Sequence, residues 1–265
     1  MTYQNNSTDT DRWAGILKAA IEQPGLVLSA YTNFHNYSIG NQLAAMLQCH
    51  LRGIQPGPIA TYPRWQQLGR QVRRGEKAIE LCMPITVKHD TEEDEPETFT
   101  RFLWKKNWFV LSQTDGEPVA PEPIPDWDDA RALEALKISK VPFDYTNGNV
   151  QGFARKRQIA ISPLAALPQK TAFHEIAHIL LGHTEEGDVN DGETIPRSLR
   201  EAEAESVAMI CCESLGIDGA PYCRGYIQGW LEGAPIPERS AQRIFKAADQ
   251  ILKAGRPAEK GAPHV

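Results

Sequence analysis

The sequence of 265 residues lacks the features that place a protein in or beyond a membrane. No apolar run approaches the ~20 residues that a membrane-spanning helix needs. The segment Met1–Arg12 is polar and acidic, and it shows no basic stretch followed by an apolar one, as a secretory signal would. The five cysteines form no CxxC pair, and two of them are adjacent. We therefore expect a cytoplasmic protein with free, buried thiols and no membrane partner.

An excess of positive charge is also absent, because the formal net charge is -6. The charge is unevenly spread, however. Residues 1–89 have a net charge of +4, residues 90–135 of -9 and residues 136–265 of -1. Domains average roughly 100–200 residues, so a chain of this length suggests two of them. A basic domain, an acidic connector and a near-neutral domain describe the distribution best.

The Pro- and acid-rich segment around residues 115–127 has the composition of an extended linker. We place the domain boundary there. The predicted organisation is a tail at 1–10, a first domain at 11–114, the linker at 115–127, a second domain at 128–254 and a tail at 255–265.

Apolar periodicity and end signals predict the elements. Helices are expected at 11–23, 36–51, 128–136, 168–182, 198–215 and 237–254. Strands are expected at 78–87 and within 98–113, and a strand or hairpin at 151–162. The acidic stretches 90–97 and 184–194 are expected to be loops. This pattern predicts an α+β fold, with a mixed α/β first domain and a mainly helical second domain that contains a small sheet.

The strongest chemical signal is the segment His174-Glu175-Ile176-Ala177-His178. On a helix, residues four apart share one face, so both imidazoles reach one ion. Glu175 is rotated by about 100° and suits the general base of a zinc peptidase better than a ligand. The neighbouring residues are apolar, which favours a dry site. We predict a site for Zn²⁺, or another divalent metal, with His174 and His178 as ligands.

A third protein ligand is needed, and the HExxHxxGxxH pattern that would supply a histidine is missing. The helix at 198–215 offers carboxylates instead. We predict Glu201 as the ligand and Glu205 as the acceptor that orients a ligand histidine, and the reverse assignment stays open. Glu203 lies on the opposite face, and His183 is read as a helix-end or substrate-side residue.

The remaining parts of a peptidase site are less defined. The segment 158–162 is a candidate edge strand that pairs with an extended peptide substrate. Tyr145, His183 and Tyr222 are candidates to stabilise an oxyanion.

In the amino-terminal half, basic residues cluster and aromatic residues lie among them. Such a surface holds single-stranded nucleic acid by neutralising phosphates and stacking bases. The alternative is that the rings are core and the arginines are merely solvated. The candidates are Tyr37, Arg64, Trp65, Arg70, Arg73, Arg74 and Lys77.

Three segments of this half, 34–42, 62–79 and 110–116, resemble the amino-terminal domain of ArdC-type antirestriction proteins. The HEIAH helix and the segments 204–217, 226–230 and 241–252 resemble the same family. The resemblance implies a single-stranded-DNA-binding domain followed by a zincin-like metallopeptidase domain, in a protein of mobile elements that protects incoming DNA from restriction. It supports His174, Glu175, His178 and the helix of Glu201 and Glu205. It also implies that the segments 36–42, with Asn41, and 64–77 face DNA.

The segment after the second motif histidine, Ile179-Leu-Leu-Gly-His183, is more similar to ImmA/IrrE-type peptidases. Two alternatives therefore stay open. One is a regulatory metalloprotease that cleaves a repressor, and the other is a DNA-binding protein with a vestigial peptidase site.

Overall fold

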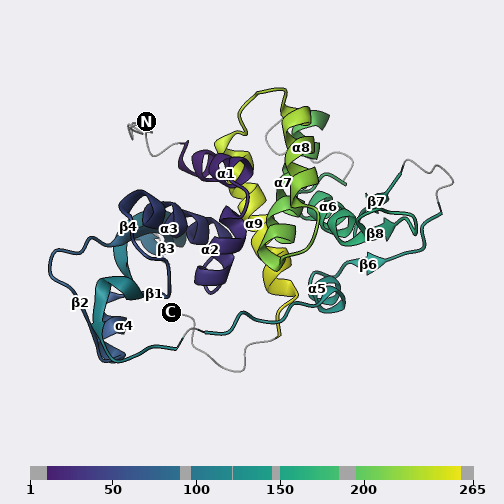
Figure 1. Ribbon diagram of the computed structural model, residues 1–265. Helices are drawn as coiled ribbons and strands as arrows, with labels where there is room; N and C mark the ends of the chain where they lie inside the picture. Colours follow the sequence, from purple (N-terminus) through teal and green to yellow (C-terminus); the bar gives the residue numbers. More distant parts are fainter. Residues whose placement is uncertain (1–10, 90–96, 121, 145–149, 185–194, 258–265) are drawn as a thin grey trace. The chain divides into compact units, whose positions relative to one another are not determined.

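The computed structural model describes residues 11–89, 97–120, 122–144, 150–184 and 195–257 (Figure 1). Packing divides the chain into two compact units. The hairpin unit is Asn33–Pro123, and the helical unit combines the residues up to Thr32 with those from Ile124 onward. Both units contain helices and strands, so the predicted α+β class is confirmed.

The hairpin unit is built around two long antiparallel strands. Its elements are α3 (Ile39–Arg52), β1 (Ile59–Thr61), α4 (Tyr62–Gln67), β2 (Arg70–Val72), β3 (Ile79–His89), β4 (Glu97–Val110), the 3-10 helix η2 (Leu111–Gln113) and β5 (Thr114–Gly116). β4 lies between β1 and β3, and β2 pairs with β5 in a separate ladder. The acidic loop predicted between the long strands falls on residues 90–96, outside the described part.

Two amides of α3 cover the outer edge of β3. Asn41 donates to the carbonyl of Cys82 and accepts from its N–H, at 2.8 and 2.9 Å. Gln48 makes the same pair of bonds with the backbone of Glu80, at 2.8 and 2.9 Å. Seven residues span two helical turns, which brings these side chains beside alternate residues of the strand. The backbone groups of Glu80 and Cys82 on the open edge of β3 are thereby paired.

The helical unit has α7 at its centre. Its elements are α1 (Arg12–Glu22), α2 (Leu26–Phe34, of which the last two residues fall in the hairpin unit), α5 (Asp129–Ala135), β6 (Ser139–Lys140), β7 (Gly152–Arg155), β8 (Gln158–Ile161), α6 (Pro168–Leu180), α7 (Arg197–Leu215), α8 (Ala220–Leu231) and α9 (Glu238–Ala254). Within α7 every residue from 202 to 214 is buried, and α6, α8 and α9 all pack against it. Its buried glutamates must therefore find partners inside the unit.

Helices α1 and α9 are in contact, although they lie far apart in the sequence. α1 packs against α9, and the carboxylate of Glu238 accepts the backbone N–H groups of Trp13 and Ala14 at 3.2 and 2.8 Å. These are two of the N–H groups that the first turn of a helix leaves unpaired. The sequence-based boundary placed α1 with the following domain, whereas packing places it with the carboxy-terminal residues.

The small sheet has the order β6-β8-β7. β8 pairs in parallel with β6, with Ser139 opposite Gln158, and antiparallel with β7. The prediction that residues 158–162 form an edge strand is therefore wrong, because a partner some twenty residues earlier in the chain occupies the second side. The strand at the edge beside α6 is β7.

Most predicted elements are present within a few residues of their expected bounds, including the six helices and the two hairpins. The sequence reading missed α2, α4 and α8 and the short strands β1, β2, β5 and β6. The linker predicted at 115–127 begins later, because Asp115 and Gly116 pair with Gln71 and Arg70 in the β2–β5 ladder. All five cysteines are free and buried, as predicted. No described helix is both long and apolar enough to cross a membrane.

Candidate metal centre

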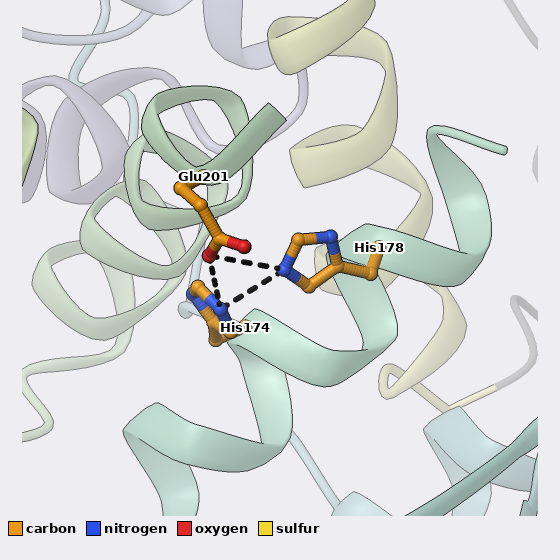
Figure 2. A group of neighbouring side chains, drawn as sticks. All are labelled: His174, His178 and Glu201. Atoms are coloured by element: carbon orange, nitrogen blue, oxygen red, sulfur yellow. Dashed lines mark hydrogen bonds and ion pairs between the residues drawn. The ribbon is translucent and has the colours of Figure 1, made fainter. Parts of the chain in front are cut away.

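The helix α6 places the two motif histidines beside α7. Pro168 stands in its first turn, where a missing N–H costs nothing. Phe173, Ile176 and Ala177 are fully buried and fix the rotation of the helix. His174 and His178 then point toward Glu201 of α7, as Figure 2 shows.

The three side chains form a triangle of ligand atoms. The Nε2 atoms of His174 and His178 are 3.0 Å apart, and Oε2 of Glu201 lies 3.5 and 3.6 Å from them. Ligand atoms at ~2.0–2.1 Å from a tetrahedral ion are roughly 3.3 Å from one another. Two imidazoles and one carboxylate that leave a fourth position open are also the donor set of zinc peptidases. The residues present therefore fit one divalent ion.

Glu175 lies beside this triangle in a water-poor environment. Burial raises the pKa of its carboxyl to about 7, although the positive charge of His174 opposes the shift. A Cβ on Gly152 would lie 3.1 Å from Oε1 of Glu175 and 2.8 Å from Cγ2 of Thr171. Only glycine leaves room for this approach, so the backbone of β7 runs directly past the carboxylate.

His174 is held from behind by a carboxylate. Its Nδ1 lies 3.3 Å from Oε1 of Glu205, which is itself 2.6 Å from Nζ of Lys170. Burial alone would disfavour the charged ring, but the hydrogen bonds with Glu201 and then Glu205 outweigh it and raise the pKa of His174 to about 9. The sequence reading missed Lys170, although it precedes His174 by one helical turn and shares its face.

The two carboxylates of α7 that contact His174 have lowered pKa values. Burial tends to raise the pKa of Glu205, but His174 and Lys170 together lower it to about 2. Hydrogen bonds from His174 and His178 hold the pKa of Glu201 far below its usual range. Glu205 contacts the Nδ1 side of His174, whereas Glu201 contacts the Nε2 side. This geometry favours Glu201 over Glu205 as the ligand.

The three oxyanion candidates have different positions. Tyr145 lies outside the described residues. His183 is buried behind His178 and does not face a substrate. Tyr222 is 62% exposed on α8.

Several of the predicted DNA contacts are internal to the hairpin unit. Trp65 is 1% exposed, and its Nε1 donates to the carbonyl of Phe109, so its ring offers no stacking face. Tyr37 donates to the carbonyl of Ile59, and Asn41 is bound to β3. Trp65 is therefore a core residue, and the expectation that it stacks on a base is wrong. Tyr37 and Asn41 are only half-buried, so their contact with DNA stays a prediction.

The basic residues predicted to contact DNA divide into two groups. Arg70 donates to the side chain and carbonyl of Thr114 and to the carbonyl of Gly116, and Arg73 pairs with Glu76 and Asp115. Both guanidinium groups therefore contact β5 and stabilise its pairing with β2. Arg64, Arg74 and Lys77 are exposed.

A second exposed basic surface was missed by the sequence reading. Along β4 the residues Arg101, Phe102, Leu103, Lys105 and Lys106 are all exposed, and Phe102 is 68% exposed. Exposure of consecutive strand residues means that both faces of the hairpin reach solvent here. We call these five residues the β4 surface.

Comparisons with known proteins agree with this architecture. Residues 12–114 match the family described as the N-terminal domain of anti-restriction factor ArdC. A protein of Sinorhizobium fredii (strain NBRC 101917 / NGR234), "Uncharacterized protein y4eC", is 25% identical over 230 residues, which cover 80% of this chain and 75% of that protein.

Two crystal structures of the antirestriction protein ArdC from the R388 plasmid have a similar fold. The metal-free structure is 20% identical with a TM-score of 0.54, over 92% of this chain and 97% of that one. The Mn(II)-bound structure is 19% identical with a TM-score of 0.52, over 93% and 99%.

The fold and the site define a two-unit α+β protein in which an HExxH helix faces a glutamate-bearing helix, the pairing typical of zincin-type domains. Its amino-terminal part and its fold are similar to those of ArdC proteins. Its residues 12–114 match the ArdC amino-terminal domain, and its fold is that of ArdC.

Proposed function

We propose that this protein is an antirestriction protein of a mobile element, which binds single-stranded DNA and carries a divalent metal in its HExxH site. The match of residues 12–114 to the ArdC amino-terminal domain carries the antirestriction part. The triangle of His174, His178 and Glu201 carries the metal part. Mn(II) binding by the R388 protein supports a divalent ion, and the tetrahedral donor set favours Zn²⁺.

The site also suits hydrolysis of a peptide or similar carbonyl compound. A bound divalent ion would act as a Lewis acid toward a carbonyl and would lower the pKa of a water molecule. Glu175, with a pKa of about 7, is balanced to accept a proton and to release it again near neutral pH. The backbone of β7 passes this carboxylate, so an extended chain paired with β7 would present its carbonyl groups there.

Substitution of Glu175 separates the candidate functions. A metal-loaded Glu175→Gln variant keeps all three ligands but has no base. Loss of hydrolysis of labelled, unfolded casein with full metal content would support a peptidase. DNA protection that is unchanged in the same variant would show that antirestriction needs no proteolysis.

Binding to single-stranded DNA tests the other half of the proposal. We expect a fluorescent oligonucleotide to bind more tightly than the matching duplex, with an affinity that falls as salt rises. Replacing Arg101, Lys105 and Lys106 with alanine should weaken binding by about tenfold or more and reduce the log–log salt slope by roughly 0.7 for each lost phosphate contact. The triple variant of Arg64, Arg74 and Lys77 should act in the same direction.

The matched control is Lys18→Ala, which removes one exposed positive charge from α1 of the helical unit. It should leave the affinity nearly unchanged. Equal binding of single strand and duplex at low salt would contradict the proposed DNA function. Unchanged affinity in both triple variants would place the contacts elsewhere on the hairpin unit.

A further inference from the structure

His183 follows the end of α6 and turns back under the helix. Gly182 has φ +74°, a left-handed conformation that suits glycine and reverses the chain direction. The N–H of His183 then donates to the carbonyl of His178 at 2.8 Å. The imidazole of His183 is 4% exposed and lies beside the ring of His178, with ring centroids 5.1 Å apart. The turn thus places a second imidazole behind a candidate metal ligand.

The two rings and one glutamate form a continuous chain of contacts. Nδ1 of His178 is 2.9 Å from Nδ1 of His183, and Nε2 of His183 is 2.9 Å from Oε2 of Glu203. Glu203 is completely buried in α7, 3.7 Å from the Nη1 atom of Arg243, and it accepts a hydrogen bond from Ser240. This series of contacts links the ligand triangle, through His178 of α6, to Glu203 of α7 and then to Arg243 of α9.

Only one arrangement of protons suits this chain when His178 binds a metal through Nε2. Its remaining proton must then sit on Nδ1, which makes Nδ1 a donor. Nδ1 of His183 must accept that hydrogen bond, so the proton of His183 sits on Nε2. Nε2 points at the carboxylate of Glu203, which is an acceptor. In this series of contacts from His178 to Glu203, every donor therefore faces an acceptor.

We propose that His183 and Glu203 are positioning residues that fix the tautomer and orientation of His178 for metal binding. This inference rests on the proposed metal site. Second partners of this kind orient ligand histidines and raise their affinity for the ion. The two ligand histidines are supported differently, because His174 contacts a carboxylate directly while His178 reaches one through a second imidazole.

The test compares metal affinities of His183 variants by chelator competition with Zn²⁺. His183→Leu removes the acceptor, and we expect its affinity to fall by roughly 10- to 100-fold. His183→Gln retains a side-chain acceptor and should recover part of the loss. Thermal unfolding of the metal-free proteins checks that each variant folds. If His183→Leu does not fold, the comparison rests on His183→Gln and Glu203→Gln, both of which should still bind more weakly than the parent.

A second readout follows the protons directly. In the ¹⁵N spectrum of the Zn²⁺-loaded parent, His178 should carry its proton on Nδ1 and His183 on Nε2.

The outcomes distinguish the metal site from the positioning role of His183. A parent protein that binds no Zn²⁺ would overturn the metal site itself. A parent that binds Zn²⁺ while the His183 variants bind it equally well, or in which His183 carries its proton on Nδ1, would overturn the positioning role alone.

Discussion

Replacing Glu201 with alanine is expected to lower the affinity for Zn²⁺ by more than about 100-fold, beyond the 10- to 100-fold typical of residues that only orient a ligand. The reason is that Glu201 supplies the only carboxylate oxygen of the triangle, 3.5 and 3.6 Å from the two imidazole nitrogens. Its pKa is held far below the usual range by its hydrogen bonds with His174 and His178, so the charge is present at any working pH. Chelator competition measures the change.

Two further variants make this result specific. Glu134→Ala removes one exposed carboxylate from α5 and controls for the change in net charge, so its affinity should match that of the parent. Glu205→Ala removes the contact with Nδ1 of His174, and its affinity for Zn²⁺ should lie between those of Glu201→Ala and Glu134→Ala. Full Zn²⁺ binding by Glu201→Ala together with complete loss in Glu205→Ala would show that the two glutamates have exchanged roles.

The affinity for metal is also expected to rise steeply with pH. In the metal-free protein the pKa of His174 is raised to about 9, because hydrogen bonds with Glu201 and Glu205 outweigh its burial. Its ring therefore binds a proton at pH 7 and must release it when an ion binds. One displaced proton corresponds to an increase in apparent affinity of up to about tenfold per pH unit, or roughly 50-fold from pH 7 to pH 9, with a plateau above that range.

The same titration has a built-in control. Glu205→Gln removes one of the carboxylates that stabilise the charged ring, so the pKa of His174 should fall and the plateau should begin at lower pH. Proton release on metal addition, measured in a weakly buffered solution, should decrease in parallel. An affinity that is constant between pH 7 and pH 9 in the parent would show that His174 is neutral in the metal-free protein.

The parts of the site that lie on single helices could be read from the sequence. The spacing of His174 and His178 and that of Glu201 and Glu205 follow from helical geometry alone. The structure brings His174, His178 and Glu201 together and puts Glu205 behind His174. Helical spacing predicts these two positions, and the roles of the two glutamates stay predictions.

The parts that depend on distant neighbours could not be read in this way. The interior position of β8 in its sheet depends on pairing with β6, and the local sequence of residues 158–162 does not indicate that pairing. Trp65 stands among arginines in the sequence, yet its ring fills the core of the hairpin unit. The sequence places Glu203 only on the opposite face of α7, because its partners His183 and Arg243 come from the turn after α6 and from α9.

Local signals also misled in a few places. Pro24 and Gly25 indicate a helix end, and they do end α1, but α2 begins immediately afterward at Leu26. Pro221, Gly225 and Gly229 concealed α8, because glycine and proline weaken a helical pattern. Packing against α7 stabilises α8 in spite of these residues.

The link between α1 and α9 has a consequence for the order in which the chain folds as it is synthesised. The hairpin unit is one continuous stretch, so all its residues are available once Pro123 has left the ribosome. α1 is made earlier, yet the carboxylate that pairs its first N–H groups belongs to Glu238, more than two hundred residues later. Domains generally fold as units during synthesis. The helical unit therefore completes last although it contains the first helix, and a nascent chain must keep the apolar face of α1 soluble while the hairpin unit forms.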